Sequence, residues 1–69
     1  MPKAEITNQI RRLRFEHDEM TQQDLADRVG CSRQTIVLLE QERYVPSLAL
    51  AMRIAQVFDE SVEGIFQLV

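Results

Sequence analysis

The sequence contains few of the residues that build cross-links, metal sites or membrane spans. Its 69 residues include one cysteine, one histidine and two glycines. A single cysteine excludes an internal disulfide and fits the reducing cytoplasm, where we expect the protein to be located. One histidine, His17, does not supply a metal site, and we expect it instead at the C-terminal end of a helix. The apolar runs are too short for a signal peptide or a transmembrane helix, so no membrane partner is expected.

The groups needed for catalysis are also scarce. An enzyme needs a nucleophile beside a base, paired carboxylates in a cleft, or metal ligands. Cys31 and His17 lie in different segments, and no glycine-rich loop is available to hold a phosphate. We therefore predict no catalytic residues, no cofactor and no enzyme activity.

The composition does support one small helical domain. Hydrophobic residues make up 45% of the chain, and its length leaves room for a single domain, residues 1–69, with a marginal core. The formal net charge of −3 is unfavourable for a partner as acidic as nucleic acid. However, Arg28, Arg33 and Arg43 surround one segment and acidic residues lie near the far end, and such a distribution can still steer DNA to one face.

Residues 21–40 predict two short helices joined by a tight turn. Thr21 and Ser32 are candidate N-caps, and Asp24 lies where it can complete a capping box with Thr21. Gly30 is the stop signal between the helices, because only glycine adopts a left-handed conformation without strain. Two helices joined so tightly cross steeply, as in a helix-turn-helix motif. The alternative is an ordinary helical hairpin with a solvated polar end.

Three further helices and one strand are predicted outside this motif. A first helix would be capped by Thr7 or Asn8 and run to about Asp18, a fourth would follow Ser47, and a short fifth would follow Ser61. The expected apolar stripe of the fourth helix consists of Leu48, Ala51, Ile54, Ala55 and Phe58. Residues 1–5 show no periodicity, whereas residues 66–69 alternate weakly and fit a strand that pairs with residues 5–7. The predicted fold class is all-α, with the option of a short β-ribbon between the two ends.

Five segments occur in a characteristic order between Ile10 and Phe66. They are I-R-R-L-R, M-T-Q-Q-D-L-A, V-G-C-S-R-Q-T-I, L-E-Q-E-R-Y-V-P-S-L and R-I-A-Q-V-F…V-E-G-I-F. Each is weak alone, but the five at this spacing closely resemble the phage-repressor (Cro/cI) helix-turn-helix family, also called the xenobiotic-response-element family. The resemblance implies a compact five-helix, lambda-repressor-like domain that binds operator DNA as a homodimer and regulates transcription, here expected to be a repressor.

The resemblance also implies roles for individual residues. The recognition helix, about residues 32–40, would enter the major groove of a palindromic operator. The base-contacting positions are Arg33, Gln34 and Leu38, and the backbone-contacting positions are Gln22, Thr35, Arg43 and Tyr44. Arg33 has the two donors needed to pair with guanine, and Gln34 has the donor and the acceptor needed to pair with adenine. Arg14 and Glu40 occupy positions that pair across the first and third helices in the family.

The sequence departs from the family pattern at three positions. Val37 and Leu38 stand where polar or basic side chains are usual, and they are interpreted as contacts either to thymine methyls or to protein. Glu42 replaces the usual glycine after the third helix, at a cost of about 1 kcal/mol if it takes the left-handed conformation. It also brings a negative charge close to the expected path of the phosphates.

The C-terminal segment is unusually apolar for so small a domain. Its apolar residues are Val62, Ile65, Phe66, Leu68 and Val69. A core of this size cannot cover all of them from one side, so we predict an isologous homodimer interface here. Such a dimer would place two recognition helices about 34 Å apart, in successive major grooves. The alternative is that these residues only close the core of the monomer.

Two other interpretations stay open. Phe15 lies on the opposite face of the first helix from Ile10 and Leu13, and it either covers a loop or belongs to an interface. The alternative function is an antitoxin-like protein-interaction module built on the same helical domain. A longer apolar tail than one ending at Val69 would favour that function.

Overall fold

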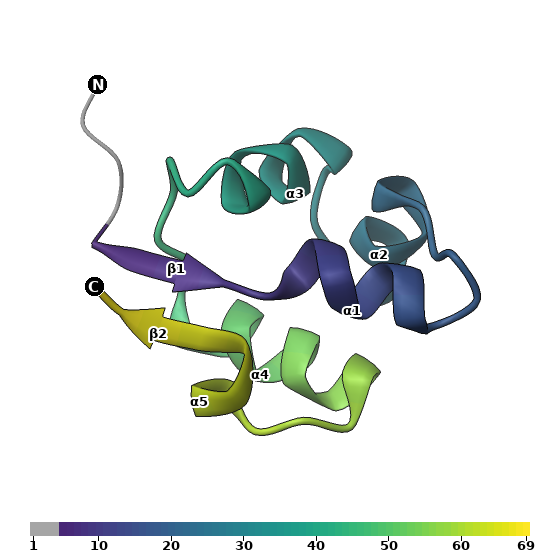
Figure 1. Ribbon diagram of the computed structural model, residues 1–69. Helices are drawn as coiled ribbons and strands as arrows, with labels where there is room; N and C mark the ends of the chain where they lie inside the picture. Colours follow the sequence, from purple (N-terminus) through teal and green to yellow (C-terminus); the bar gives the residue numbers. More distant parts are fainter. Residues whose placement is uncertain (1–4) are drawn as a thin grey trace.

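Five short helices and two strands follow one another in the computed structural model, which describes residues 5–69 (Figure 1). The elements are β1 (Ile6–Asn8), α1 (Ile10–Glu16), α2 (Gln22–Val29), α3 (Arg33–Glu40), α4 (Leu48–Phe58), α5 (Val62–Ile65) and β2 (Phe66–Leu68). The predicted five-helix fold with a terminal β-ribbon is therefore confirmed. Residues 1–4, for which no regular structure was predicted, lie outside the described residues. None of the helices within residues 5–69 is long and apolar enough to cross a membrane.

The helix-turn-helix segment is fixed by local hydrogen bonds at its helix ends. The Thr21 hydroxyl accepts the backbone N–H of Asp24 at 3.0 Å, and the Asp24 carboxylate accepts the backbone N–H of Thr21 at 3.2 Å, which completes the predicted capping box. Gly30 ends α2 with φ +78°, in the left-handed conformation. The Ser32 hydroxyl accepts the N–H of Thr35 at 3.2 Å and caps α3. These local signals define where α2 ends and α3 begins, and the two helices pack against each other.

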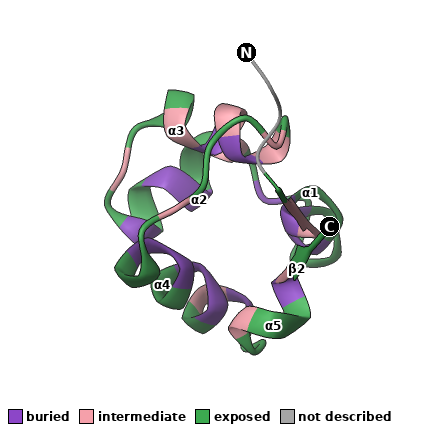
Figure 2. Ribbon diagram, turned by 90° about the vertical axis from the view of Figure 1, so that its left-hand side faces the viewer, coloured by how far each residue is buried: buried purple, intermediate pink, exposed green. Residues whose placement is uncertain are grey.

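The core lies between the helices, and every helix contributes to it. Figure 2 shows the buried residues on the inward sides of the ribbons and the exposed ones outside. The largest of the fully buried side chains are Ile10, Leu25, Val29, Ile36, Leu39, Ile54 and Ile65. Leu48 was predicted in this core but is 72% exposed. It is the first residue of α4, and Leu50, two positions later, faces the core instead.

The first helix is shorter than predicted and begins differently. Thr7 and Asn8 belong to β1, so neither is the N-cap residue, although the Asn8 side chain still accepts the N–H of Ile10 at 3.1 Å. The helix ends at Glu16 because the chain reverses through Asp18 and Glu19, which have φ values of 56° and 53°. This reversal brings α2 back across α1.

The antiparallel ribbon joins two segments from opposite ends of the chain. Ile6 pairs with Leu68 and Asn8 with Phe66. The Asn8 side chain also donates to the backbone oxygen of Leu39 at 2.7 Å, so the ribbon is tied to the last turn of α3. Because the last carbonyl oxygens of a helix have no donor from the helix itself, this bond and the one from the N–H of Glu42 together stabilise the C-terminal end of α3.

Candidate nucleic-acid interface

The outward face of α3 carries the candidate readout residues. Ile36 and Leu39 are fully buried, which fixes the opposite side of the helix toward solvent. Arg33 and Gln34 are exposed there, and Leu38 is half-buried. Val37 is half-buried as well, so both of the unusual apolar residues keep part of their side chains accessible at the surface. The face therefore combines donors with apolar atoms, the two kinds of group that can contact base edges.

An ion pair locks this helix against α1. The Nε of Arg14 donates to Oε2 of Glu40 at 2.6 Å, and its Nη2 donates to Oε1 at 3.0 Å. The Nη1 of Arg14 donates to the backbone oxygen of Met20 at 2.7 Å. The two side chains are only 10% and 9% exposed. The pairing predicted for Arg14 and Glu40 is thus present, in the bidentate form that restricts orientation most strongly.

The residues predicted to contact the DNA backbone lie in α3 or beside it. Gln22, the first residue of α2, donates from Nε2 to Oε1 of Glu40 at 3.3 Å and is therefore held beside the third helix. Thr35 is half-buried, with its hydroxyl 3.0 Å from that of Ser32. Arg43 and Tyr44 are exposed in the segment that follows α3. The structure therefore brings these four predicted residues to the border of one helix, and their contacts to DNA stay a prediction.

Glu42 follows α3 in the left-handed conformation, which is unfavourable for residues other than glycine. Its φ is +61°, and its N–H donates to the carbonyl oxygen of Leu39 at 2.9 Å. The next residue, Arg43, donates from its N–H to the carbonyl oxygen of Leu38 at 3.0 Å. These two bonds close the end of α3 at the cost of backbone strain in a residue other than glycine.

Two residues at this surface were not assigned a DNA contact from the sequence, although Arg11 was counted there among the basic residues that precede the helix-turn-helix segment. Gln41 follows α3 directly and is exposed, three positions after Leu38 and therefore near it on the helix surface. Arg11 lies on α1, three positions before Arg14. Both line an open hollow of about 330 Å³, here called the α1–α3 hollow, whose lining residues are Arg11, Arg14, Phe15, Gln22, Val37, Glu40 and Gln41. Helical spacing from Leu38 and Arg14 could have identified both residues.

The pKa values of two titratable groups in the motif differ from their ordinary values. The backbone and side-chain hydrogen bonds with Thr21 lower the pKa of Asp24, so this carboxylate stays charged at the N-terminus of α2. Partial burial raises the pKa of the Cys31 thiol. The thiol is packed against the core and stays protonated near neutral pH, which is unsuitable for a nucleophile or a metal ligand. Within residues 5–69 the structure contains no group of three or more potential metal-binding side chains.

The predicted C-terminal interface needs one correction. Ile65 is fully buried in the core of the monomer, so it cannot contact a second copy. Val62 and Phe66 are half-buried against the same core. Leu68 and Val69, in contrast, are 85% and 87% exposed. Ile65 is the last residue of α5 and faces the core, whereas Leu68 ends β2 and Val69 follows it, beyond the part of the segment that packs against the core.

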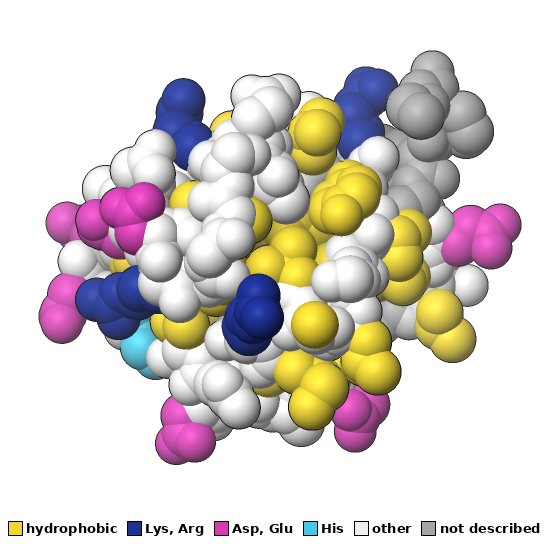
Figure 3. Space-filling model, turned by 180° about the vertical axis from the view of Figure 1, so that it is seen from behind, with side chains coloured by type: hydrophobic (Ala, Val, Ile, Leu, Met, Phe, Trp, Pro, Cys, Tyr) yellow, Lys and Arg dark blue, Asp and Glu magenta, His cyan; other side chains and the backbone are white. Residues whose placement is uncertain are grey.

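Apolar and charged side chains are separated on the surface. Figure 3 shows hydrophobic side chains gathered on the face turned away from the viewer of Figure 1, with charged side chains around their border. Within residues 5–69, the exposed large hydrophobic residues outside α1 are Tyr44, Val45, Leu48, Met52, Leu68 and Val69. Surface of this kind is typical of a contact with another macromolecule.

The capped helix pair, the glycine turn between the two helices and the exposed face of α3 define a helix-turn-helix domain of the DNA-binding class. A family model described as helix-turn-helix matches residues 10–65, and the chain belongs to the Cro/cI-type helix-turn-helix family.

Similar proteins come from archaea and bacteria. The chain is 46% identical over 61 residues to the uncharacterised HTH-type transcriptional regulator MJ0272 of Methanocaldococcus jannaschii, covering 88% of this chain and 91% of that protein. It is 57% identical over 47 residues to an uncharacterised HTH-type transcriptional regulator of Archaeoglobus fulgidus, covering 68% and 66% of the two chains. The crystal structure of a candidate DNA-binding protein from Bacteroides fragilis has the same fold, with a TM-score of 0.77 at 22% identity over 90% of this chain and 98% of that one.

Proposed function

We propose that this protein is a sequence-specific transcriptional repressor that binds a palindromic operator as a homodimer in the cytoplasm. The observation that carries the proposal is the exposed face of α3, held in place by the Arg14–Glu40 pair. A helix enters the major groove productively only if its orientation is fixed, because base contacts need hydrogen-bond geometry. Membership of the family and the names of the relatives support the same proposal.

Base readout is assigned to the first turns of α3. The guanidinium of Arg33 can donate two hydrogen bonds to guanine O6 and N7, and the amide of Gln34 can pair with adenine N6 and N7. Leu38 lies one turn further along the helix from Gln34, where an aliphatic side chain can contact a thymine methyl. Gln22, Thr35, Arg43 and Tyr44 would bind the sugar-phosphate backbone and fix the register of the helix.

The homodimer is assigned to the C-terminal end. Leu68 and Val69 are almost fully exposed, and Val62 and Phe66 retain part of their surface. Burial of this apolar surface against a second copy about a two-fold axis would remove it from water. The dimer would also double the number of base contacts and match the symmetry of a palindromic site.

Selection from a random duplex library followed by binding titrations tests this function. The wild-type protein is expected to enrich a palindrome. Arg33→Ala and Gln34→Ala should each weaken binding to that site by about 1–3 kcal/mol and relax preference at one base pair. Gln22→Ala should weaken all sequences alike. If the chain enriches no sequence and binds a partner protein instead, the interaction-module alternative is correct.

Sedimentation at micromolar concentration tests the dimer separately. Leu68→Asp is expected to shift the protein toward monomer, because a charge on the contact surface would have to be desolvated. At a protein concentration low enough for the wild type to be monomeric, the thermal unfolding of Leu68→Asp should stay close to that of the wild type. A wild-type protein that sediments as a monomer and binds its operator as one copy per site would contradict the homodimer.

A further inference from the structure

The first arginine of α1, beside the helix-turn-helix motif, differs from the other two arginines of that helix. Arg11 is exposed on α1, and no carboxylate among residues 5–69 forms a salt bridge with it. The other two arginines of α1 are paired, Arg12 with Glu16 at 3.1 Å and Arg14 with Glu40 at 2.6 Å. Arg11 therefore keeps its guanidinium donors available for an anion.

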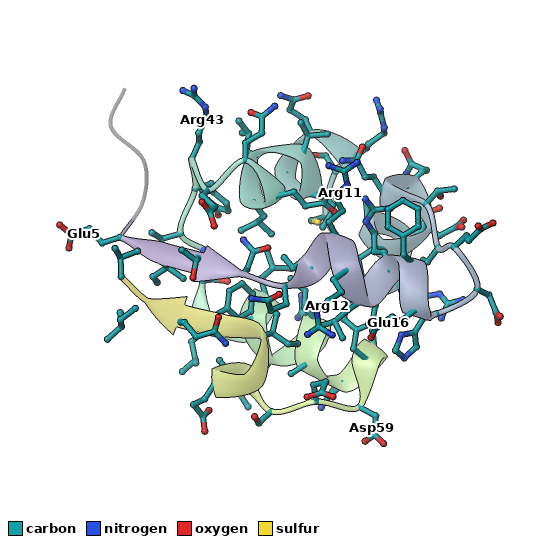
Figure 4. All side chains as sticks on the ribbon, viewed as in Figure 1. Glu5, Arg11, Arg12, Glu16, Arg43 and Asp59 are labelled. Atoms are coloured by element: carbon teal, nitrogen blue, oxygen red, sulfur yellow. The ribbon has the colours of Figure 1, made fainter. Side chains whose placement is uncertain are left out.

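The direction of the Arg11 side chain is restricted by an aromatic ring. Its guanidinium carbon lies 6.0 Å from the centroid of the Phe15 ring, and that of Arg14 lies 5.9 Å from the same centroid. Such contacts lower the conformational freedom that a long side chain would lose on binding a ligand. Figure 4 shows Arg11 directed toward α3, whereas Arg12 points to the other side of α1, beside Glu16. Phe15, which is 56% exposed, thus supports a basic side chain at the surface.

Arg11 leaves the α1–α3 hollow with a net positive charge. The one carboxylate that lines the hollow belongs to Glu40, and both of its oxygens already accept hydrogen bonds, from Arg14 and Gln22. Arg14 and Glu40 neutralise each other, so the charge of Arg11 is not compensated within the hollow. The volume of about 330 Å³ is enough for a phosphate group and several water molecules.

We propose that Arg11 binds a DNA phosphate in this hollow and is the backbone contact on the α1 side of α3. The proposal rests on the proposed function, because the phosphate reaches Arg11 only when α3 enters a major groove. A helix in that groove is flanked by two backbones. Arg43, beyond the C-terminal end of α3, lies at a different border of the helix from Arg11 (Figure 4), and Tyr44 follows Arg43 in the chain. The planar guanidinium of Arg11 can donate two parallel hydrogen bonds to phosphate oxygens, next to the amide of Gln22.

Arg11→Ala and Arg12→Ala form a matched pair for testing this contact, because both remove an exposed arginine from the same helix. Binding is measured over a range of salt concentrations, with the selected operator and with a mixed-sequence duplex as probes. Arg11→Ala is expected to weaken both complexes about fivefold at low salt and to reduce the salt slope by about one. Arg12→Ala should remain within about twofold of wild type. Arg11→Lys should restore the salt slope and only part of the affinity, since a lysine cannot form the bidentate contact.

Each other outcome would overturn the assignment in a distinguishable way. If Arg11→Ala binds both duplexes like Arg12→Ala while the wild type still selects an operator, Arg11 is not a contact and the proposed function stands. If Arg11→Ala changes preference at one base pair without a uniform loss, Arg11 reads a base. A wild-type protein that binds neither duplex overturns both proposals. Matching urea unfolding curves for the two alanine variants exclude loss of folding as the cause.

Discussion

The helix-turn-helix half and the terminal half of this domain are stabilised in different ways. The α2–α3 segment is defined by contacts between near neighbours, such as the Thr21–Asp24 capping box and the left-handed Gly30. The ribbon of β1 and β2 depends on residues about as far apart as the chain allows, Ile6 and Leu68. The two halves meet at α3, where the Arg14–Glu40 pair and the Asn8 amide hold the same helix. The comparison shows that local signals define the ends of the recognition helix α3, whereas contacts with residues far away in the sequence orient it.

The largest effect is expected where distant contacts orient α3. Glu40→Ala should lower the free energy of unfolding by about 3–5 kcal/mol, because it leaves the buried guanidinium of Arg14 without its carboxylate. Glu16→Ala removes the partner of Arg12 in an ion pair that is more than half exposed, and it should cost less than about 0.5 kcal/mol. Urea unfolding of both variants checks the difference. Similar small losses in the two variants would show that the buried pair does not hold α3.

The next largest effect on stability is expected from a core residue of the C-terminal end, compared with a surface residue of the same segment. Ile65→Ala should destabilise the domain by about 2–4 kcal/mol, because it opens a cavity in the core. Leu68→Ala should change the stability of the monomer by less than about 0.5 kcal/mol, since the side chain is exposed. Thermal unfolding at low protein concentration makes the comparison. A large loss from Leu68→Ala under those conditions would mean that this residue is covered within the monomer.

A third effect compares the two left-handed residues at the ends of α2 and α3. Gly30→Ala should cost about 1–2 kcal/mol from backbone strain alone, because nothing lies within 4 Å of the added Cβ. Glu42→Gly should stabilise the domain by about 0.5–1 kcal/mol, since it relieves the strain at φ +61°. It should also tighten binding to DNA at low salt by removing a negative charge near the phosphates. Calorimetry and a binding titration on the two variants test the pair, and a destabilised Glu42→Gly would assign that side chain a stabilising contact.

The smallest expected effect is the dependence of stability on pH through Asp24. Because hydrogen bonds with Thr21 lower the pKa of Asp24 in the folded state, its contribution to stability is present above the ordinary carboxyl pKa of about 4. That contribution is lost as the pH falls through the lower, folded-state pKa. The stability difference between wild type and Asp24→Asn should therefore shrink on acidification. A difference that stays constant from neutral pH to pH values well below 4 would contradict the capping role of the charge.

Local signals in the sequence were enough to predict most of the helix-turn-helix half. Thr21, Gly30, Ser32, Ser47 and Ser61 all have the cap or stop role that their short-range chemistry indicates. The family pattern located the partners Arg14 and Glu40, although they are 26 positions apart. The DNA contacts and the homodimer stay predictions.

The wrong predictions concern residues whose burial depends on how the helices and strands pack together. Periodicity could not show that Leu48 faces solvent and Leu50 the core, because both fit an apolar helix. It also could not separate Ile65, which is buried in the core, from its exposed neighbour Leu68. The sequence could not show which arginine of α1 has no ion pair, because that depends on the pairs that Arg12 and Arg14 form in the folded structure.

The ribbon that joins the two ends of the chain also has a consequence for the order of folding. To pair Ile6 with Leu68, the chain must close a loop that contains all five helices, and the entropy of that closure opposes early formation of the ribbon. Helix pairs such as α2 and α3 need only short loops and can form contacts sooner. We therefore expect φ-values near zero for ribbon residues and fractional values in α2 and α3. The recognition helix would then exist in outline before the last contact that ties down its C-terminal end.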